Sequence, residues 1–264
     1  VLLGDPTLRI IPPQRDSLMS VSTGIARDGK TTLQSRQKVD VQGSLNPYSG
    51  AGTAEIKVFD SAVFYNLDAQ SRVSHRGTTL FKGSASVSSG QYEAAFIVPD
   101  DITNGDTGSI VSYLWDAQAQ QDYVNYHYPV TTSDQAVQAE NLSAPAIELF
   151  LGSYDFRPGD TVSTSPTLLA RISDDNGINL TGSAGHNILL VIDNSIQPIP
   201  VTSYFSYDQD SYTSGILRYP ISGLSEGPHS VQVVAFDNFN LPSVTSTQFI
   251  AKKTGALSIE RLLI

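Results

Sequence analysis

The sequence predicts an all-β protein made of two tandem β-sandwich domains of immunoglobulin-like type. Apolar and polar residues alternate with a period of two through many short stretches, which is the pattern of half-buried strands. No stretch shows a convincing helical period, and a chain of 264 residues is long enough for two domains. The alternation is lost between residues 131 and 145, where small and polar residues collect. We therefore expect one sandwich on each side of that segment.

The first sandwich is predicted over residues 15–140. Its clearest element is a hairpin, in which residues 81–87 alternate, Ser88-Ser89-Gly90 supplies a turn, and residues 92–98 alternate again. We expect about six short strands in residues 36–130. Pro99 closes the strand before it, because proline cannot donate to a β-ladder.

The second sandwich is predicted over residues 146–251. Residues 188–192 and 231–236 are apolar on both faces, which is typical of strands in the middle of a sandwich. Turn signals such as Asp174-Asp175-Asn176-Gly177 separate the strands. The two halves share no repeat period, which argues against a solenoid or a propeller.

Composition excludes several classes of function. The chain has 26 Asp+Glu against 16 Lys+Arg, and the resulting net charge of -10 repels phosphate backbones, so nucleic acid is a poor partner. It has no cysteine, which excludes thiol catalysis and cysteine-ligated zinc in this chain. The apolar runs are far shorter than the ~20 residues needed to cross a bilayer, so we expect no membrane span.

One segment resembles a serine nucleophile elbow. Gly223–Gly227 matches G-x-S-x-G with Ser225 at its centre, but that motif needs a helix after it, and here Pro228 and a predicted strand follow. We therefore favour a chance match over an independent hydrolase, which would also need a cleft with coupled titratable groups. Leu224, the last glycine and His229 have the spacing of the corner that pins a loop to the next strand in immunoglobulin-like domains. This spacing predicts a structural role for His229.

The other histidines predict no metal site. His75, His127 and His186 are scattered, and none pairs with another histidine at the spacing of a strand or helix zinc site. His186 lies in a glycine-rich turn, where we expect a hydrogen bond that fixes the loop.

Two acidic turns carry candidate calcium ligands, namely Asp174 and Asp175 in one and Asp208 and Asp210 in the other. Both turns are rich in oxygen atoms, which a hard cation prefers. Neither turn completes a known calcium loop, because the glycine and the distant glutamate of an EF-hand are missing after Asp210. Solvated turns are the favoured alternative, and we expect no other cofactor.

Strand-borne aromatic residues leave a second class of function open. Alternating aromatics are usually core residues or cross-strand pairs, but exposed ones could stack on sugars. One contiguous exposed patch would favour an adhesion or glycan-binding module, whereas burial would favour a structural scaffold. The residues concerned are Tyr113, Trp115, Tyr123, Tyr126 and Tyr128.

Several stretches resemble the gingipain-type cysteine peptidases, and among these the sortases of the type IX secretion system. The segment Leu2-Leu3-Gly4-Asp5-Pro6-Thr7-Leu8 resembles the end of the peptidase domain. The other stretches resemble the β-sandwich domains downstream of it. They are residues 80–85, 96–102, 172–179, Gly185-His186, 210–215 and Arg218-Tyr219-Pro220.

The resemblance implies the C-terminal part of a Bacteroidetes surface peptidase. Residues 1–14 would end the peptidase domain, and residues 252–264 would lead to a further domain. The family's catalytic cysteine and histidine would lie upstream of Val1, and no residue here matches either. The implied role is a non-catalytic support for that peptidase domain in cis, docked to an outer-membrane β-barrel and other surface proteins of the secretion system. The implied location is extracellular, attached to the outer membrane.

Overall fold

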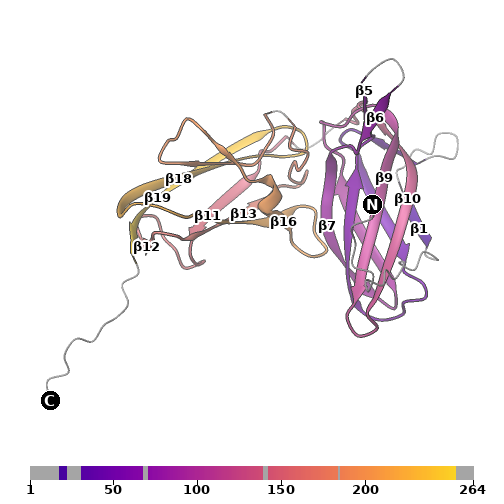
Figure 1. Cartoon of the computed structure of the whole chain (residues 1–264), viewed down its shortest axis with the longest axis horizontal. Coiled ribbons are helices and arrows are strands. Elements are labelled where there is room, and N and C mark those ends of the chain that lie inside the picture. Colours follow the sequence, from indigo (N-terminus) through magenta and orange to yellow (C-terminus); the bar gives the residue numbers. More distant parts are fainter. Residues whose placement is uncertain (1–17, 23–30, 68–70, 139–141, 184, 254–264) are drawn as a thin grey trace, which may run out of the picture.

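The computed structural model describes residues 18–22, 31–67, 71–138, 142–183 and 185–253, and it confirms the predicted all-β class (Figure 1). Within these residues the helical content is one short 3₁₀ turn, η1 (Thr202–Tyr204). No helix in this part of the chain is long and apolar enough to cross a membrane. The strands form two bodies that follow one another along the sequence (Figure 1).

The first body is an eight-stranded sheet with the order β1-β3-β8-β7-β4-β9-β10-β2. Every pairing is antiparallel except that of β10 with β2. The strands are β1 (Leu18–Ser22), β2 (Thr32–Gln34), β3 (Lys38–Ser44), β4 (Gly52–Phe59), β7 (Thr79–Ser88), β8 (Gln91–Ile97), β9 (Gly105–Asp116) and β10 (Gln121–Ser133).

This sheet folds over at the hairpin that the sequence predicts. β7 and β8 share only two residue pairs next to the turn, after which β7 follows β4 and β8 follows β3. Side chains from both arms then meet in the core, where the rings of Phe81 and Phe96 stack with centroids 5.2 Å apart. The hairpin therefore joins two layers around one apolar interior.

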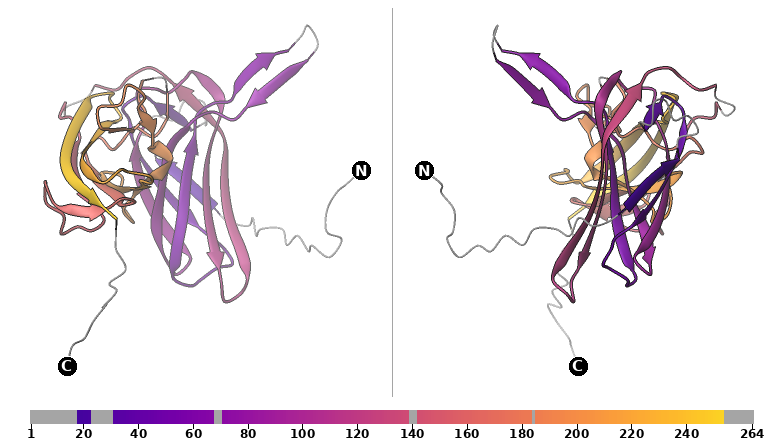
Figure 2. Two further views of the ribbon diagram at one scale, coloured as in Figure 1. Left: turned by 60° about the vertical axis from the view of Figure 1, so that its left-hand side comes forward. Right: turned by 90° about the vertical axis from the view of Figure 1, so that its right-hand side faces the viewer.

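A second hairpin projects from this body. β5 (Val63–Asn66) and β6 (Arg72–His75) pair only with each other and reach away from the eight-stranded sheet (Figure 2). Sequence periodicity does not predict these two strands, because their residues do not alternate between apolar and polar. We call this element the projecting hairpin.

The second body contains two sheets, with the orders β11-β13-β17-β16 and β12-β19-β18-β14-β15. Within the second sheet β12 runs parallel to β19. The strands are β11 (Ala146–Leu151), β12 (Thr161–Ser163), β13 (Thr167–Ser173), β14 (Leu189–Ile192), β15 (Ile199–Pro200), β16 (Phe205–Tyr207), β17 (Ser214–Pro220), β18 (Gly227–Phe236) and β19 (Pro242–Lys252).

Burial in the second body corrects one expectation. Residues 188–192 and 231–236 were expected to be buried on both faces, but in β18 only Val231, Val233 and Ala235 are fully buried, and the residues between them are half-buried. Alternate residues of β18 therefore face the core, and the residues between them are partly exposed to solvent. Val234 and Phe236 are apolar although they lie on the partly exposed face of β18.

The predicted domain limits are only partly visible. β10 continues to Ser133 and β11 begins at Ala146, so most of the segment between residues 131 and 145 lies between the two bodies. The exact limits stay a prediction. Residues 1–14, expected to end a peptidase domain, lie outside the described residues, as do residues 254–264 of the expected linker.

Candidate functional site

The two bodies meet at a polar cluster centred on Asp101, which follows β8. Its carboxylate accepts hydrogen bonds from Asn179 Nδ2 at 2.8 Å, Asn240 Nδ2 at 3.0 Å and Thr181 Oγ1 at 3.0 Å, all from the second body. His186 Nδ1 donates to the same carboxylate at 2.8 Å, so the expected loop-fixing hydrogen bond of His186 is confirmed. Burial alone would raise the pKa of Asp101, but these hydrogen bonds hold it below its usual value.

A second set of contacts surrounds the neighbouring Asp100. Arg36 binds its carboxylate through two nitrogens, with Nε 2.8 Å from Oδ1 and Nη2 2.6 Å from Oδ2. The Asp100 amide donates to the Asn238 carbonyl at 2.7 Å, and Asn238 Nδ2 donates to the Ile97 carbonyl at 3.0 Å. Arg36 also lies 5.1 Å above the Phe239 ring. Hydrogen bonds in both directions and the Arg36–Phe239 contact thus connect the loop after β8 to the loop between β18 and β19.

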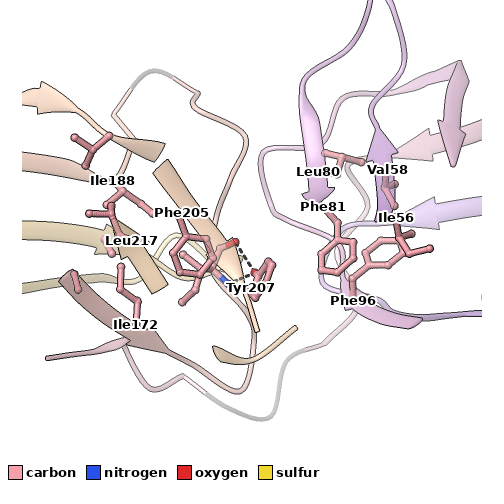
Figure 3. Packing of buried hydrophobic residues seen from close by; sticks show 14 of the residues in the cluster. Ile56, Val58, Leu80, Phe81, Phe96, Ile172, Ile188, Phe205, Tyr207 and Leu217 are labelled. Atoms are coloured by element: carbon pink, nitrogen blue, oxygen red, sulfur yellow. Dashed lines mark hydrogen bonds between the residues drawn. The ribbon is translucent and has the colours of Figure 1, made fainter. Parts of the chain in front are cut away.

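An aromatic contact connects the two cores (Figure 3). Phe81 of β7 packs against Tyr207 of β16 with ring centroids 5.3 Å apart. The Tyr207 hydroxyl accepts from the Ile178 amide at 2.6 Å and donates to the Ile178 carbonyl at 2.9 Å. Lys38 lies 5.6 Å above the Tyr212 ring. Buried aromatic groups therefore continue across the junction.

The predicted calcium ligands do not converge. Asp210 contacts the first body, because its carboxylate accepts from the Ser86 amide and hydroxyl, each at 2.6 Å, and its amide donates to the Ser84 carbonyl. Asp208 accepts from the Ser214 hydroxyl within its own turn at 2.8 Å. Among the described residues there is no group of three or more His, Cys, Asp or Glu side chains placed to hold a metal ion.

Asp174 occupies a buried position, and its amide donates to the Thr213 carbonyl at 2.8 Å, beside the second acidic turn. It accepts from the Asn176 amide at 2.7 Å. Burial, together with the nearby charges of Asp237 and Asp175, raises its pKa to about 6. Asp237 is also buried, and burial raises its pKa too, although it accepts from Leu241, Asn176 and Phe239. Calcium binding by Asp174, Asp175, Asp208 and Asp210 stays a prediction that this geometry does not favour.

Ser225 and His229 form a corner. His229 Nε2 lies 2.9 Å from the Ser225 carbonyl and 3.4 Å from the Ser225 hydroxyl, while Nδ1 lies 2.7 Å from Asp193 Oδ2. A carbonyl and a carboxylate only accept hydrogen bonds, so these two contacts favour the ring form in which both nitrogens are protonated. The hydrogen bonds to Asp193 and Ser225 accordingly raise the pKa of His229. Nε2 lies closer to the Ser225 carbonyl than to the Ser225 hydroxyl, so the geometry does not place His229 to take a proton from that hydroxyl.

Two exposed apolar surfaces remain. The projecting hairpin exposes Val63, Phe64, Tyr65, Leu67 and Val73, of which Leu67 is 70% exposed. Four of the five aromatic residues singled out in the sequence are exposed on the first body, and only Tyr123 is buried. The hairpin and the Asp101 cluster are the features that sequence reasoning missed, since neither follows a periodic pattern or a known motif.

No protein-family model matches the chain, and no curated protein matches it. Among solved structures it is similar to dimeric latent PorU from Porphyromonas gingivalis, with a TM-score of 0.55 and 24% identity over 96% of this chain. The chain spans 25% of the length of that PorU chain. Red sea bream transglutaminase also aligns over 89% of this chain and 31% of its own, but a TM-score of 0.25 at 13% identity carries no argument. The chain has a PorU-like fold.

Proposed function

We propose that this chain is the non-catalytic, β-sandwich part of a type IX secretion sortase-like surface peptidase. Its role is to support the peptidase domain in cis and to dock it to protein partners at the outer membrane, among them a β-barrel. The PorU-like fold supports the type of parent protein. The absence of thiols and the contacts of both His229 ring nitrogens with Asp193 and the Ser225 carbonyl support a non-catalytic role.

The sheet orders support an immunoglobulin-like second sandwich. β11-β13-β17-β16 corresponds to strands A, B, E and D, and β19-β18-β14 corresponds to G, F and C. His229, near the start of β18, bonds back to the Ser225 carbonyl, as the corner residue of such domains does. We extend the sandwich description to the first body because its sheet folds over one core.

The junction supports the scaffold role. Hydrogen bonds made by Asp101, Asp100 and Asp210 join the bodies at three places, and the Phe81–Tyr207 contact adds an apolar link. Independent domains on a flexible tether would not need this network. The two bodies would thus act as one rigid spacer that sets the distance between the peptidase domain and its partners.

The projecting hairpin carries the docking role. Adjacent residues of a strand point to opposite faces, so exposure of both Phe64 and Tyr65 leaves the hairpin apolar on both sides. A two-stranded hairpin is marginally stable in water, yet this one is anchored at its base, where Arg76 lies 4.3 Å above the Phe59 ring. The Ala62 amide also donates to Thr107 Oγ1 at 2.9 Å. An anchored, exposed apolar hairpin favours burial against another protein.

The test has two parts. The purified chain should hydrolyse no peptide substrate, and Ser225→Ala should change nothing. In solubilised outer membranes of a Bacteroidetes species, the chain should capture a β-barrel protein that mass spectrometry identifies. A Phe64→Ser, Tyr65→Ser variant should lose that capture, whereas Ile196→Ser, at a residue 94% exposed in the second body, should keep it. Hydrolysis abolished by Ser225→Ala, or capture unaffected by the hairpin variant, would contradict the proposal.

A further inference from the structure

A row of aromatic residues crosses the outer face of β9 and β10, and β4 lies between these strands and β7, whose Ser86 binds Asp210 of the second body. We call it the aromatic stripe, and it consists of Trp115, Tyr113, Tyr126 and Tyr128. All four side chains are between 39% and 58% exposed. Their neighbours Ser112, Leu114, Tyr123 and Asn125 point inward and are buried, so the stripe belongs to one face of the sheet.

Strand register orders the stripe. Trp115 lies opposite Asp122, Tyr113 lies opposite Val124, and Tyr126 lies opposite Val111. Tyr128 continues the row, with its ring stacked on Tyr126 at a centroid distance of 5.8 Å and an interplanar angle of 14°. Each step of two residues advances about 7 Å along a strand, so the four rings span about 20 Å. A row of this length suits an extended chain rather than a single small molecule.

The charges beside the stripe show no positive excess. Glu55 lies opposite Tyr113 on β4, with Lys57 Nζ at 2.9 Å and Lys82 Nζ at 3.7 Å from its carboxylate. Asp122 accepts from the Tyr113 hydroxyl at 2.5 Å. Glu55 and Asp122 therefore face two lysines, Asp116 adds a third acidic group at one end of the stripe, and the whole chain carries a net charge of -10. Such a face lacks the positive field that would attract a polyanion.

One end of the stripe opens into a recess of about 550 Å³ at the tip of the β9–β10 hairpin. Trp115 lines it together with Tyr48 and Tyr123, whose ring centroids are 5.1 Å apart. Asp116 and Gln118 supply polar groups to the same wall. Aromatic walls with a few polar groups are typical of ligand sites. Trp115 therefore belongs both to the stripe and to a recess whose Tyr123 comes from the inward face of the sheet.

We propose that the aromatic stripe and its recess form a binding site for a neutral polysaccharide. A sugar ring offers an apolar C–H face, which the electron-rich face of an aromatic ring attracts, and hydroxyls at its edge, which carboxylates and amides bind. The stripe supplies the ring faces in a line, and Asp116, Gln118 and Asp122 lie along its edge. This site goes beyond the scaffold role and does not depend on it.

The single tryptophan of the chain gives a direct measurement. Trp115 is part of the site, so its fluorescence reports occupation of the stripe without a label. We expect saturable changes in emission with at least one of the soluble neutral polysaccharides mannan, dextran and galactomannan. Glucose alone should bind at least about tenfold more weakly, because it covers one ring and not the row. Dextran sulfate should bind no better than dextran.

Substitutions in the stripe test whether its rings bind the polysaccharide. Affinity electrophoresis in the same polysaccharides should show about tenfold weaker binding for Tyr126→Ala, and Trp115→Phe should retain most of it. Tyr65→Ala is the matched control, since Tyr65 and Tyr126 are each 58% exposed and Tyr65 lies on the projecting hairpin. The proposal is overturned if none of the three neutral polysaccharides binds, if dextran sulfate binds better, or if Tyr65→Ala weakens binding equally. A dimer in solution that Tyr126→Ala dissociates would instead assign the stripe to a second copy of the chain.

Discussion

Phe81 and Tyr207 touch across the junction with ring centroids 5.3 Å apart, and each ring also belongs to the core of its own body. Phe81 stacks on Phe96 in the first body, and Tyr207 meets the edge of Phe205 in the second at 5.1 Å. Four rings thus continue from one core to the other. Because buried contacts transmit strain, we expect the two bodies to unfold as one cooperative unit.

Tyr207→Phe should weaken that unit without removing the ring contact. The hydroxyl satisfies both the amide and the carbonyl of Ile178, which is fully buried, so its loss leaves buried polar groups unpaired. We expect a loss of roughly 1–3 kcal/mol in the free energy of unfolding, measured by urea denaturation. Tyr204→Phe, at an exposed tyrosine in η1, is the control. Equal effects of the two substitutions would show that the Ile178 hydrogen bonds do not matter.

Asp101→Asn should loosen the junction while both bodies stay folded. An amide in place of the carboxylate turns one acceptor into a donor that faces Asn179, Asn240, Thr181 and His186. We expect faster hydrogen exchange in residues 177–187 and a larger radius of gyration in X-ray scattering. The exposed Asp106→Asn on β9 should change neither.

The same carboxylate gives a pH dependence. Because the pKa of Asp101 is lower in the folded chain, its stabilising effect is present above its unfolded pKa of about 3.9 and is lost as pH falls through the folded value. The variant should therefore differ from the parent chain at neutral pH and approach it in acid. A difference that persists unchanged at pH 2 would contradict this assignment.

Much of this architecture could be predicted from sequence, because alternation reports directly which residues face a core. It identified the β7–β8 hairpin and six strands of the second body, although not the short strands β12, β15 and β16, and the loop spacing placed His229 in a corner. Alternation could not show that β7 and β8 share only two residue pairs. That number depends on their pairing with β4 and β3, which are distant in the sequence. Nor could it show that Asp210 binds Ser86, because contacts between bodies leave no local pattern. The projecting hairpin was missed because it has no buried face to impose alternation.

Calcium should not change the melting temperature of this chain. The geometry commits Asp210 to Ser86 and Asp208 to Ser214, so neither is free to gather around an ion with Asp174. We expect equal melting temperatures in millimolar calcium and in chelator. Asp210→Ala should lower the melting temperature by the same amount in both, because it removes two hydrogen bonds across the junction. A stabilisation by calcium that Asp210→Ala abolishes would restore the calcium site.

The His229 corner should lose strength as pH rises. The pKa of His229 is raised in the folded chain, so the stabilisation that the charged ring provides is complete below its unfolded pKa of about 6.5 and disappears above the folded value. Thermal melts from pH 5 to pH 9 should show a decline that Asp193→Asn reduces. His75→Gln, at an exposed histidine of β6, should leave the decline unchanged. A decline that survives Asp193→Asn in full would place its origin elsewhere.

Asp174→Asn should stabilise the chain at neutral pH. Burial raises the pKa of Asp174 to about 6, so the folded chain holds a costly charge at pH 7.5 that the unfolded chain carries freely in water. For a carboxyl with a raised folded pKa, the favourable contribution is complete below about pH 3.9 and is lost as pH rises through about 6. Asparagine keeps an oxygen to accept from the Asn176 amide and carries no charge.

For Asp174→Asn we expect a gain in the free energy of unfolding of roughly 1–3 kcal/mol at pH 7.5 and none at pH 4, measured by urea denaturation. The exposed Asp155→Asn should show no such difference, and a loss of stability in Asp174→Asn at pH 7.5 would mean that the carboxylate is held by a favourable partner such as a cation.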